Sequence, residues 1–221
     1  MQLSVATLDI IKNFATINQS AVFKAGSVQK TCTPQTTIIA QATLADSFPR
    51  DFAIYDLPQF LSVLNLVDIP VLEFGDRSVT IKGNTSKVTY FYAAPENITA
   101  PPTRKIALPS IDAEFTLDAT MMKSAMQAAG VLGLSEIYVA GREGVTYIGA
   151  VDSRSKTSNY FEASVGKTSS EFHMLFKLEN LKMMPKTYHV ELSLKGIAHF
   201  TADTKDIEYW LPVSAASTIT A

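Results

Sequence analysis

The sequence predicts an α+β protein built from two domains of similar topology, each with two helices packed on antiparallel strands. Three observations lead to this expectation. One amphipathic helix pattern recurs 111 residues later, from Lys12 to Lys123, and a second recurs 121 residues later, from Leu57 to Leu178. A proline-rich stretch over 94–110 separates the two halves of the 221-residue chain.

The first predicted helix covers residues 7–18, "TLDIIKNFATIN". Apolar residues follow one of its sides and polar residues the other, at the i, i+3, i+4, i+7 spacing of a helix. The polar stripe consists of Asp9, Lys12, Asn13 and Thr16. In the second half, the corresponding helix is predicted by a polar stripe of Thr120, Lys123, Ser124 and Gln127, backed by Met122, Ala125, Met126 and Ala129.

The second predicted helix opens at Asp56 within "FAIYDLPQFLSVLNLV", residues 52–67. Its apolar face consists of Leu57, Phe60, Leu61 and Leu64, and its opposite face of Gln59, Ser62 and Asn65. A surface helix usually presents charged side chains to water, so this neutral polar stripe is unusual. The stretch 54–61 aligns with 175–182, "LFKLENLK", which predicts a fourth helix there.

Short runs rich in β-branched and aromatic residues predict the strands. In the first half these are 21–24, 36–44, 69–74, 78–82 and 86–92; in the second they are 111–117, 136–140, 145–151, 158–165, 171–176, 187–194, 197–202 and 206–213. A hairpin turn is expected from Gly141 to Gly144.

The linker candidate 94–110 holds four prolines, and Pro101-Pro102 fits neither a helix interior nor a central strand. We therefore expect one domain over 1–100 and a second over 101–221. Each half is close to electrical balance, with 7 basic and 8 acidic residues in the first 100 positions and 12 and 13 in the rest. Any basic surface must therefore come from a local cluster of lysine or arginine side chains.

The net charge of -2 predicts no global attraction to nucleic acid or to an anionic membrane. A single cysteine, Cys32, excludes an internal disulfide and fits a reducing compartment. We expect no signal peptide and no membrane-spanning run, and therefore a soluble intracellular protein.

The sequence offers no catalytic constellation. "VGKTS" at 165–169 looks like the end of a phosphate-binding loop, but that motif needs a glycine where Phe161 stands. His173, His189 and His199 lie in strand-like runs without metal-ligand spacing. We therefore expect that the protein is not an enzyme and that it binds neither a metal ion nor a cofactor.

Three stretches resemble a known family: "IKNFATIN" (11–18), "FAIYDLPQFLSVLNLV" (52–67) and "NLKMMPKTYHVELSLKG" (180–196). They are similar to the sliding clamps of T-even-type bacteriophages, the processivity factors of the viral DNA polymerase. The matching stretches follow one another in the same order as in that family, and the similarity covers most of the chain. The segment 120–170 matches poorly.

This resemblance implies two clamp domains per chain and three chains joined head to tail in a closed ring, with duplex DNA threaded through the hole. It also implies tethering of the DNA polymerase and opening and closing of the ring by an ATP-dependent clamp loader. Support of late transcription is implied as well. The clamp would hydrolyse nothing, would contact no membrane, and would work in the cytoplasm of the infected bacterial host.

A place in such a ring would explain the neutral helix face, because Gln59 and Asn65 would look onto a water-filled channel around DNA. Sparse lysines between neutral polar groups would offer weak, readily exchanged phosphate contacts. The candidate hole-facing bases are Lys12, Lys123, Lys177 and Lys182. Ala128 and Ala129 stand where the family suggests more positive charge.

Partner peptides in such clamps insert apolar residues beside the interdomain connector. The apolar candidates here are Ile106, Leu108, Trp210, Leu211 and Val213, although Trp210 fits a core position equally well.

For the ring contacts, the sequence favours the edge strands 88–92 and 159–165, with Tyr92 and Phe161 as aromatic anchors.

Two other readings remain open at this stage. A scaffold or binding protein from another two-repeat α+β family would show the same pattern without encircling DNA. An unrecognised hydrolase would need a nucleophile, a base and an acid, which the sequence does not assemble. The solution mass separates the clamp from a monomeric scaffold.

Overall fold

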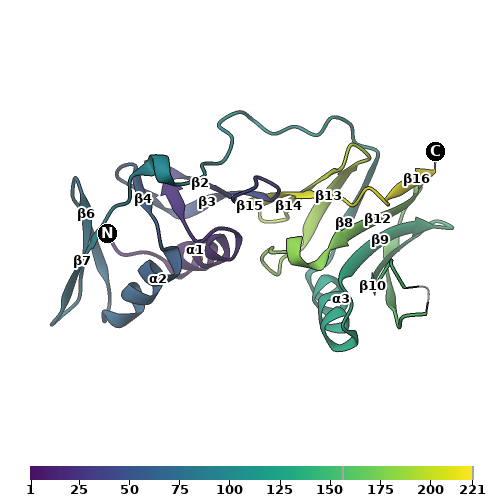
Figure 1. Ribbon diagram of the computed structural model, residues 1–221, viewed down its shortest axis with the longest axis horizontal. Coiled ribbons are helices and arrows are strands. Elements are labelled where there is room, and N and C mark those ends of the chain that lie inside the picture. Colours follow the sequence, from purple (N-terminus) through teal and green to yellow (C-terminus); the bar gives the residue numbers. More distant parts are fainter. Residues whose placement is uncertain (156, 221) are drawn as a thin grey trace. The chain divides into compact units, whose positions relative to one another are not determined.

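Helices pack on antiparallel strands in both halves of the chain, which confirms the α+β class (Figure 1). The computed structural model describes residues 1–155 and 157–220. The chain divides into two units, Met1–Thr103 and Arg104–Ala221.

The first unit contains two α-helices and seven strands over its described residues. In chain order these are α1 (Val5–Ile17), β1 (Ala21–Phe23), β2 (Gly26–Cys32), β3 (Ile39–Phe48), β4 (Phe52–Ile54), α2 (Leu57–Leu66), β5 (Val71–Phe74), β6 (Ser78–Lys82) and β7 (Lys87–Phe91), followed by the short 3-10 helix η1 (Pro95–Asn97). Strand β1 pairs with β4, β2 pairs with β3, and β5-β6-β7 form a three-stranded sheet.

The second unit contains one α-helix and nine strands over its described residues. In chain order these are β8 (Ala113–Leu117), α3 (Ala119–Leu132), β9 (Glu136–Arg142), β10 (Val145–Val151), β11 (Phe161–Lys167), β12 (Glu171–Lys177), the 3-10 helix η2 (Leu178–Asn180), β13 (Tyr188–Ser193), β14 (Ile197–Ala202), β15 (Ile207–Pro212) and β16 (Thr218–Thr220). One sheet has the order β11-β10-β9-β12-β16, and β8, β13, β14 and β15 pair in the order β8-β13-β14-β15.

The three α-helices begin at side chains that cap their free backbone N–H groups. Ser4 accepts from the Thr7 amide at 3.2 Å, Asp56 from the Gln59 amide at 2.8 Å, and Asp118 from the Thr120 amide at 2.8 Å. These hydrogen bonds are N-caps, which typically stabilise a helix by about 1 kcal/mol. The bond from the Thr120 amide also lowers the pKa of the Asp118 carboxyl group.

The core of the first unit is aromatic. Phe23 stacks on Phe52 with ring centroids 4.8 Å apart, Phe48 meets Phe52 edge to face at 5.0 Å, and Phe74 lies 5.2 Å from Phe52. The ring of Tyr92 completes the cluster at 5.6 Å from Phe52. Aromatic pairs of this kind add about 0.5–1.5 kcal/mol each beyond their buried area.

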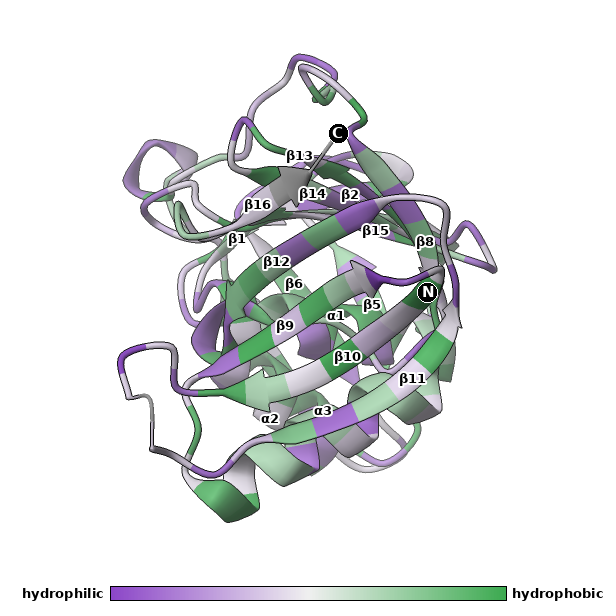
Figure 2. Ribbon diagram, turned by 90° about the vertical axis from the view of Figure 1, so that its right-hand side faces the viewer, coloured by the Kyte–Doolittle hydropathy of each residue, from purple (hydrophilic) through white to green (hydrophobic). Residues whose placement is uncertain are grey.

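Helix α3 packs across β9, β10 and β11 of the five-stranded sheet (Figure 2). The hairpin between β9 and β10 turns at Glu143 and Gly144, whose φ angles of 52° and 78° place both in the left-handed region, as the sequence predicted for a tight turn. At Gly149 a Cβ atom would lie 2.3 Å from the Tyr138 ring, so only glycine lets that ring cross β10.

The fourth helix predicted over 175–182 is wrong. Residues up to Lys177 belong to β12, and only the three-residue 3-10 helix η2 follows. Phe172, Met174 and Phe176 are buried on one face of this strand, and Leu175 is buried on the other with Tyr138 and Ala140. The segment between β12 and Pro185 is also short, and the residue before a proline disfavours helical geometry.

The internal repeat is nevertheless visible at this point. The Leu57 amide at the start of α2 donates to the Gln19 carbonyl at 2.7 Å, just after α1 ends. The Leu178 amide at the start of η2 donates to the Ser135 carbonyl at 2.9 Å, just after α3 ends. The chain therefore makes the same turn in both units, and the second unit continues it with a loop where the first unit has a helix.

Candidate nucleic-acid interface

Helix α3 presents Thr120, Lys123 and Gln127 to solvent, and it buries Met122, Ala125 and Ala129 on the opposite side. The helix contains no acidic residue. Lys123 is therefore an exposed cation on a helix face that carries only neutral polar groups beside it.

Helix α1 differs from α3 in the state of its lysine. Lys12 is exposed, but its Nζ atom lies 3.1 Å from an oxygen of Asp9, one helical turn earlier. An exposed pair at this spacing contributes only about 0.2–0.5 kcal/mol. Lys12 can exchange Asp9 for a phosphate oxygen at little cost, although the net charge of this patch is close to zero.

Helix α2 exposes a stripe without charge, as the sequence predicted. Gln59 and Asn65 are exposed, and the hydroxyl group of the exposed Ser62 donates to the Pro58 carbonyl at 2.9 Å. The Tyr90 hydroxyl lies 3.0 Å from the Gln59 Oε1 atom, which orients the amide. This leaves the Gln59 NH2 group as an outward donor.

The two lysines assigned to the fourth helix occupy different settings. Lys177 ends β12 and is exposed, with Nζ 3.8 Å from an oxygen of Glu179. Lys182 is half-buried in the segment that follows η2. Neither lies on an α-helix, so the structure does not bring them into a helical stripe with Lys123.

The predicted partner-binding residues separate into two groups. Ile106 and Leu108 are half-buried in a segment without helix or strand. Trp210, Leu211 and Val213 are only 6%, 0% and 8% exposed. The core alternative for Trp210 is thus the one observed.

Two carboxylates position the histidine on which the indole ring of Trp210 stacks. Trp210 stacks on His199 with ring centroids 4.7 Å apart, and His199 lies between Glu191 at 3.0 Å and Glu208 at 2.9 Å. Trp210 can therefore form the floor of a docking surface but cannot project from it.

The aromatic anchor chosen on β7 needs a correction. Tyr92 follows the strand, packs on Phe52 and buries its hydroxyl group, because adjacent residues of an extended chain point to opposite faces. The exposed aromatic residue at this edge is Phe91, at 70%. On the other edge, Phe161 opens β11 half-buried, and the neighbouring Tyr160 is 71% exposed.

Helices α2 and α3 each carry an exposed apolar residue close to the C-terminal end. Leu66 near the end of α2 is 77% exposed, and Val131 near the end of α3 is 86% exposed. The sequence indicates both residues, because each is apolar at a position that the helix period places on the solvent-facing side.

Each of these helices runs beside an edge strand of its own unit. Phe60 of α2 meets Tyr90 of β7 at 5.2 Å, and a Cβ atom on Gly83, in the β6–β7 turn, would lie 2.6 Å from Val67. In the second unit α3 contacts β11. Both units thus place an exposed helix end and an exposed aromatic residue along one edge.

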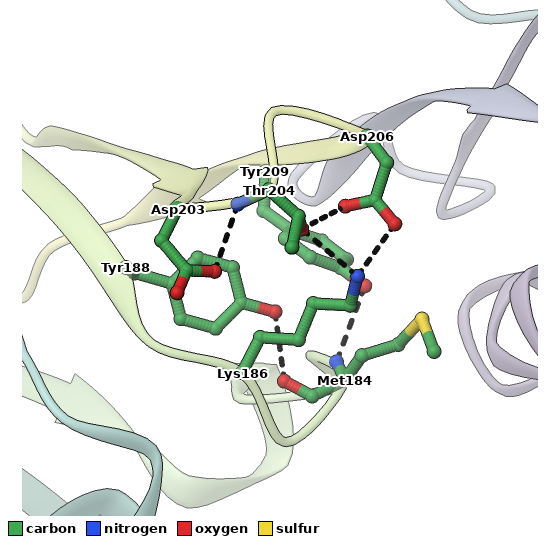
Figure 3. A network of polar contacts seen from close by, with 7 residues as sticks. All are labelled: Met184, Lys186, Tyr188, Asp203, Thr204, Asp206 and Tyr209. Atoms are coloured by element: carbon green, nitrogen blue, oxygen red, sulfur yellow. Dashed lines mark hydrogen bonds and ion pairs between the residues drawn. The ribbon is translucent and has the colours of Figure 1, made fainter.

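The segment that replaces the fourth helix is pinned to the sheet by polar contacts (Figure 3). The Tyr188 hydroxyl donates to the Met184 carbonyl at 2.7 Å, and the Met184 amide donates to the Tyr209 hydroxyl at 3.2 Å. The Lys186 ammonium group donates to Asp206 at 2.5 Å and to the Thr204 hydroxyl at 3.1 Å. Burial raises the pKa of both tyrosines.

We expect Asp206→Asn to destabilise the second unit by about 1–3 kcal/mol at neutral pH, because a charge-assisted bond to Lys186 is lost. Burial acts to raise the pKa of Asp206, but the bonds from Lys186 and Thr204 outweigh it and lower the pKa. The stabilisation is therefore present above the unfolded-state pKa of about 3.9 and is lost as the pH falls through the lower folded-state value. Urea unfolding followed by the fluorescence of Trp210, the single tryptophan, measures the difference. An equal difference at pH 2 and pH 7 would contradict this account.

In the part of the chain that the structure describes, no helix is long and apolar enough to cross a membrane. Within the same residues, no group of three His, Cys, Asp or Glu side chains is placed to hold a metal ion.

Two α+β units in one chain, with helices packed on antiparallel sheets, are consistent with the DNA-clamp fold, and the similarity to solved clamp structures identifies the fold. Solved structures with this fold include A. fulgidus PCNA bound to the C-terminal region of FEN-1, with a TM-score of 0.70, 14% identity and 94% of each chain covered. The Helicobacter pylori beta clamp bound to a DNA ligase peptide gives a TM-score of 0.71 at 14% identity, over 97% of this chain and 65% of that one.

The sequence places the chain more narrowly. The family model of the DNA polymerase processivity factor matches residues 4–98, and that of the gp45 sliding clamp, C terminal, matches 114–215. The sliding clamp of Vibrio phage KVP40 is 36% identical over 97% of this chain and 100% of its own length. The sliding clamp of Enterobacteria phage T4 is 29% identical over 89% of each chain. The chain belongs to the sliding-clamp family of T4-type bacteriophages, the DNA polymerase processivity factors.

Proposed function

We propose that three copies of the chain join head to tail in a ring that encircles duplex DNA and tethers the viral DNA polymerase. The observation that carries this proposal is the character of the exposed helix faces. Across α1, α2 and α3 they carry neutral polar groups and few charges, with Lys12 offset by Asp9 and Lys123 alone on its helix face. A protein that binds DNA by contact energy needs many more cations.

Such a surface suits a ring that must slide. Each released counterion adds to the salt dependence of binding, so few phosphate contacts mean weak binding at any one position. Neutral donors such as Gln59 and Asn65 can bond to phosphate oxygens directly or through water without fixing a register. Retention then comes from the closed ring rather than from affinity.

The edges of the two units support the head-to-tail assembly. Strand β7 lies at the edge of the three-stranded sheet, and β11 lies at the edge of the five-stranded sheet. Edge strands present unpaired backbone groups that pair readily with another chain. We propose that β7 of one subunit pairs beside β11 of the next, with Phe91 and Leu66 meeting Tyr160, Phe161 and Val131.

Partners would dock on the outside through short peptide tails. The PCNA and beta-clamp structures are bound to a region of FEN-1 and to a DNA ligase peptide, respectively. We propose that the polymerase and the ATP-dependent loader insert apolar residues beside Ile106 and Leu108 in the same manner, and that late-transcription factors use this surface too. The ring itself would catalyse no reaction and would act in the cytoplasm of the infected host.

Retention on circular DNA tests the ring directly. We expect protein loaded by the cognate loader and ATP to stay on a closed circle through a gel-filtration column and to leave within minutes once the circle is linearised. The closed ring has no other exit, and its contacts are too few to hold a linear end. Binding to a short duplex without loader should be weak at physiological salt.

Two results would contradict the proposal. Tight, loader-independent binding to a short duplex would indicate a contact-driven DNA-binding protein. A stable monomer at micromolar concentration that no loader places on a circle would favour a scaffold that does not encircle DNA.

A further inference from the structure

A cavity of about 300 Å³ opens between α3 and the segment after η2, in the position where the first unit has its second helix. Its walls are mostly apolar and include four methionines: Met122, Met126, Met183 and Met184. Among the lining residues, Met122 and Leu181 are buried, whereas the other three methionines are half-buried. The cavity lies at the small end of ligand pockets, which suits one or two apolar side chains.

The polar groups at the cavity come from α3 alone. Lys123 and Gln127 belong to its lining, and the lining contains no carboxylate. An occupant with an anionic group beside its apolar part would therefore gain a charge-assisted contact with Lys123 and meet no like charge. The unbranched, polarizable methionine side chains can adjust to more than one apolar shape.

The wall opposite α3 is held in place before any ligand arrives. Both backbone polar groups of Met184 bond to the hydroxyl groups of Tyr188 and Tyr209, whose side chains are 1% and 0% exposed (Figure 3). The Lys186 amide also donates to the Met184 carbonyl at 2.9 Å, and Lys186 is itself anchored by Asp206. Because this wall is ordered before binding, the protein loses little further conformational entropy when the pocket is occupied.

We propose that this methionine pocket binds a peptide segment of a partner protein, with one bulky apolar residue in the cavity and an adjacent carboxylate on Lys123. The charge of Lys123 and the absence of acid from the lining favour an acidic-apolar peptide over a neutral or basic one. Because the proposed function turns Lys123 toward DNA, peptide and encircled DNA compete for it. The competition between peptide and DNA rests on the proposed function, whereas binding of the peptide to protein without DNA does not depend on it.

Methyl NMR of protein labelled with [methyl-13C]methionine tests the pocket, since the chain has seven methionines. The probe is the peptide acetyl-Glu-Leu-Phe-amide, and single Met→Leu variants assign the signals. We expect the signals of Met122, Met126, Met183 and Met184 to shift together at about 1 mM peptide. Met174, 0% exposed in the core, and Met1 serve as internal controls that do not move.

Removing the charge from the peptide or from Lys123 completes the test. Acetyl-Gln-Leu-Phe-amide should bind about threefold more weakly, and Lys123→Gln should remove that difference, whereas Lys82→Gln in the first unit should not. The assignment is overturned if the four signals stay unmoved, if both peptides bind the native protein equally, or if octanoate binds as tightly as the peptide.

A final arm repeats the titration on protein loaded onto closed circular DNA. Weaker peptide binding there than on the free protein supports the competition. Equal binding on both would overturn the competition and leave the peptide site of the free protein standing. If the protein does not form the proposed ring, the loader will not place it on closed circular DNA. That outcome is therefore distinguishable from a failure of the peptide site.

Discussion

Reversing the charge at Lys12 and Lys123 together, as Lys12→Glu with Lys123→Glu, is expected to reduce the amount of protein that the loader places on closed circular DNA by about tenfold or more at low salt. In a trimer these substitutions place six carboxylates where six ammonium groups stood. Lys12→Glu also puts a carboxylate one turn from Asp9 and so releases that aspartate's own charge toward the DNA. Assembly should be spared, because both lysines are exposed and such changes usually cost within about 0.5 kcal/mol.

Lys24→Glu with Lys195→Glu is the matched control for this experiment. Lys24 pairs with Asp51 at 2.8 Å and is exposed, much as Lys12 pairs with Asp9, but it lies outside the helices. Lys195 is exposed in the turn between β13 and β14. If the control pair reduces loading as much as the helix pair, the helix faces have no special role. If the helix pair lowers the unfolding temperature by several degrees, the two lysines are structural.

The helices could be predicted from the sequence because period and cap agree there. Asp56 and Asp118 each stand directly before a run with apolar residues at helical spacing, and both are observed as N-caps. The exposed stripe of α2 then follows from the period alone, which is why Gln59 and Asn65 were predicted on the solvent side.

The fourth helix failed because two periods compete in one segment. Leu178 and Leu181 lie at helical spacing, but Phe172, Met174 and Phe176 just before them alternate as a strand does. The segment forms a strand because β12 pairs with β9 along six residue pairs. The alignment with α2 was informative about topology and misleading about the local structure.

Strand β2 was missed because two of its three buried side chains, those of Gln29 and Thr31, are polar. Gln29 is 1% exposed, and its amide bonds to the backbone of Lys24 and Gly26 at 2.8 and 3.0 Å. Hydrophobic patterning cannot detect a buried residue whose hydrogen bonds are satisfied by its own loop. The side to which Trp210 and Tyr92 face was hard to predict for a related reason. Both are aromatic residues in or beside strands, where facing depends on a one-residue register that only the paired strands establish.

Introducing a charge at either proposed subunit edge is expected to break the trimer. Phe91→Asp in β7 and Val131→Glu at the end of α3 each replace an exposed apolar side chain, 70% and 86% exposed in the single chain. Burying a side chain of this size at an interface contributes about 1.5–3 kcal/mol, and a carboxylate buried without a partner adds a desolvation cost. A head-to-tail ring contains three such interfaces, so each substitution acts three times.

Sedimentation at micromolar concentration should therefore show the native mass as a trimer and both variants as monomers, with urea unfolding of each unit little changed. Val28→Asp and Leu194→Glu are the controls, since both side chains are 48% exposed and lie away from β7 and β11 in sequence and in sheet order. These controls should remain trimers. Variants that stay trimeric would show that the edges meet elsewhere. Monomeric variants that a loader still retains on closed circles would separate DNA retention from ring closure and so contradict the topological mechanism itself.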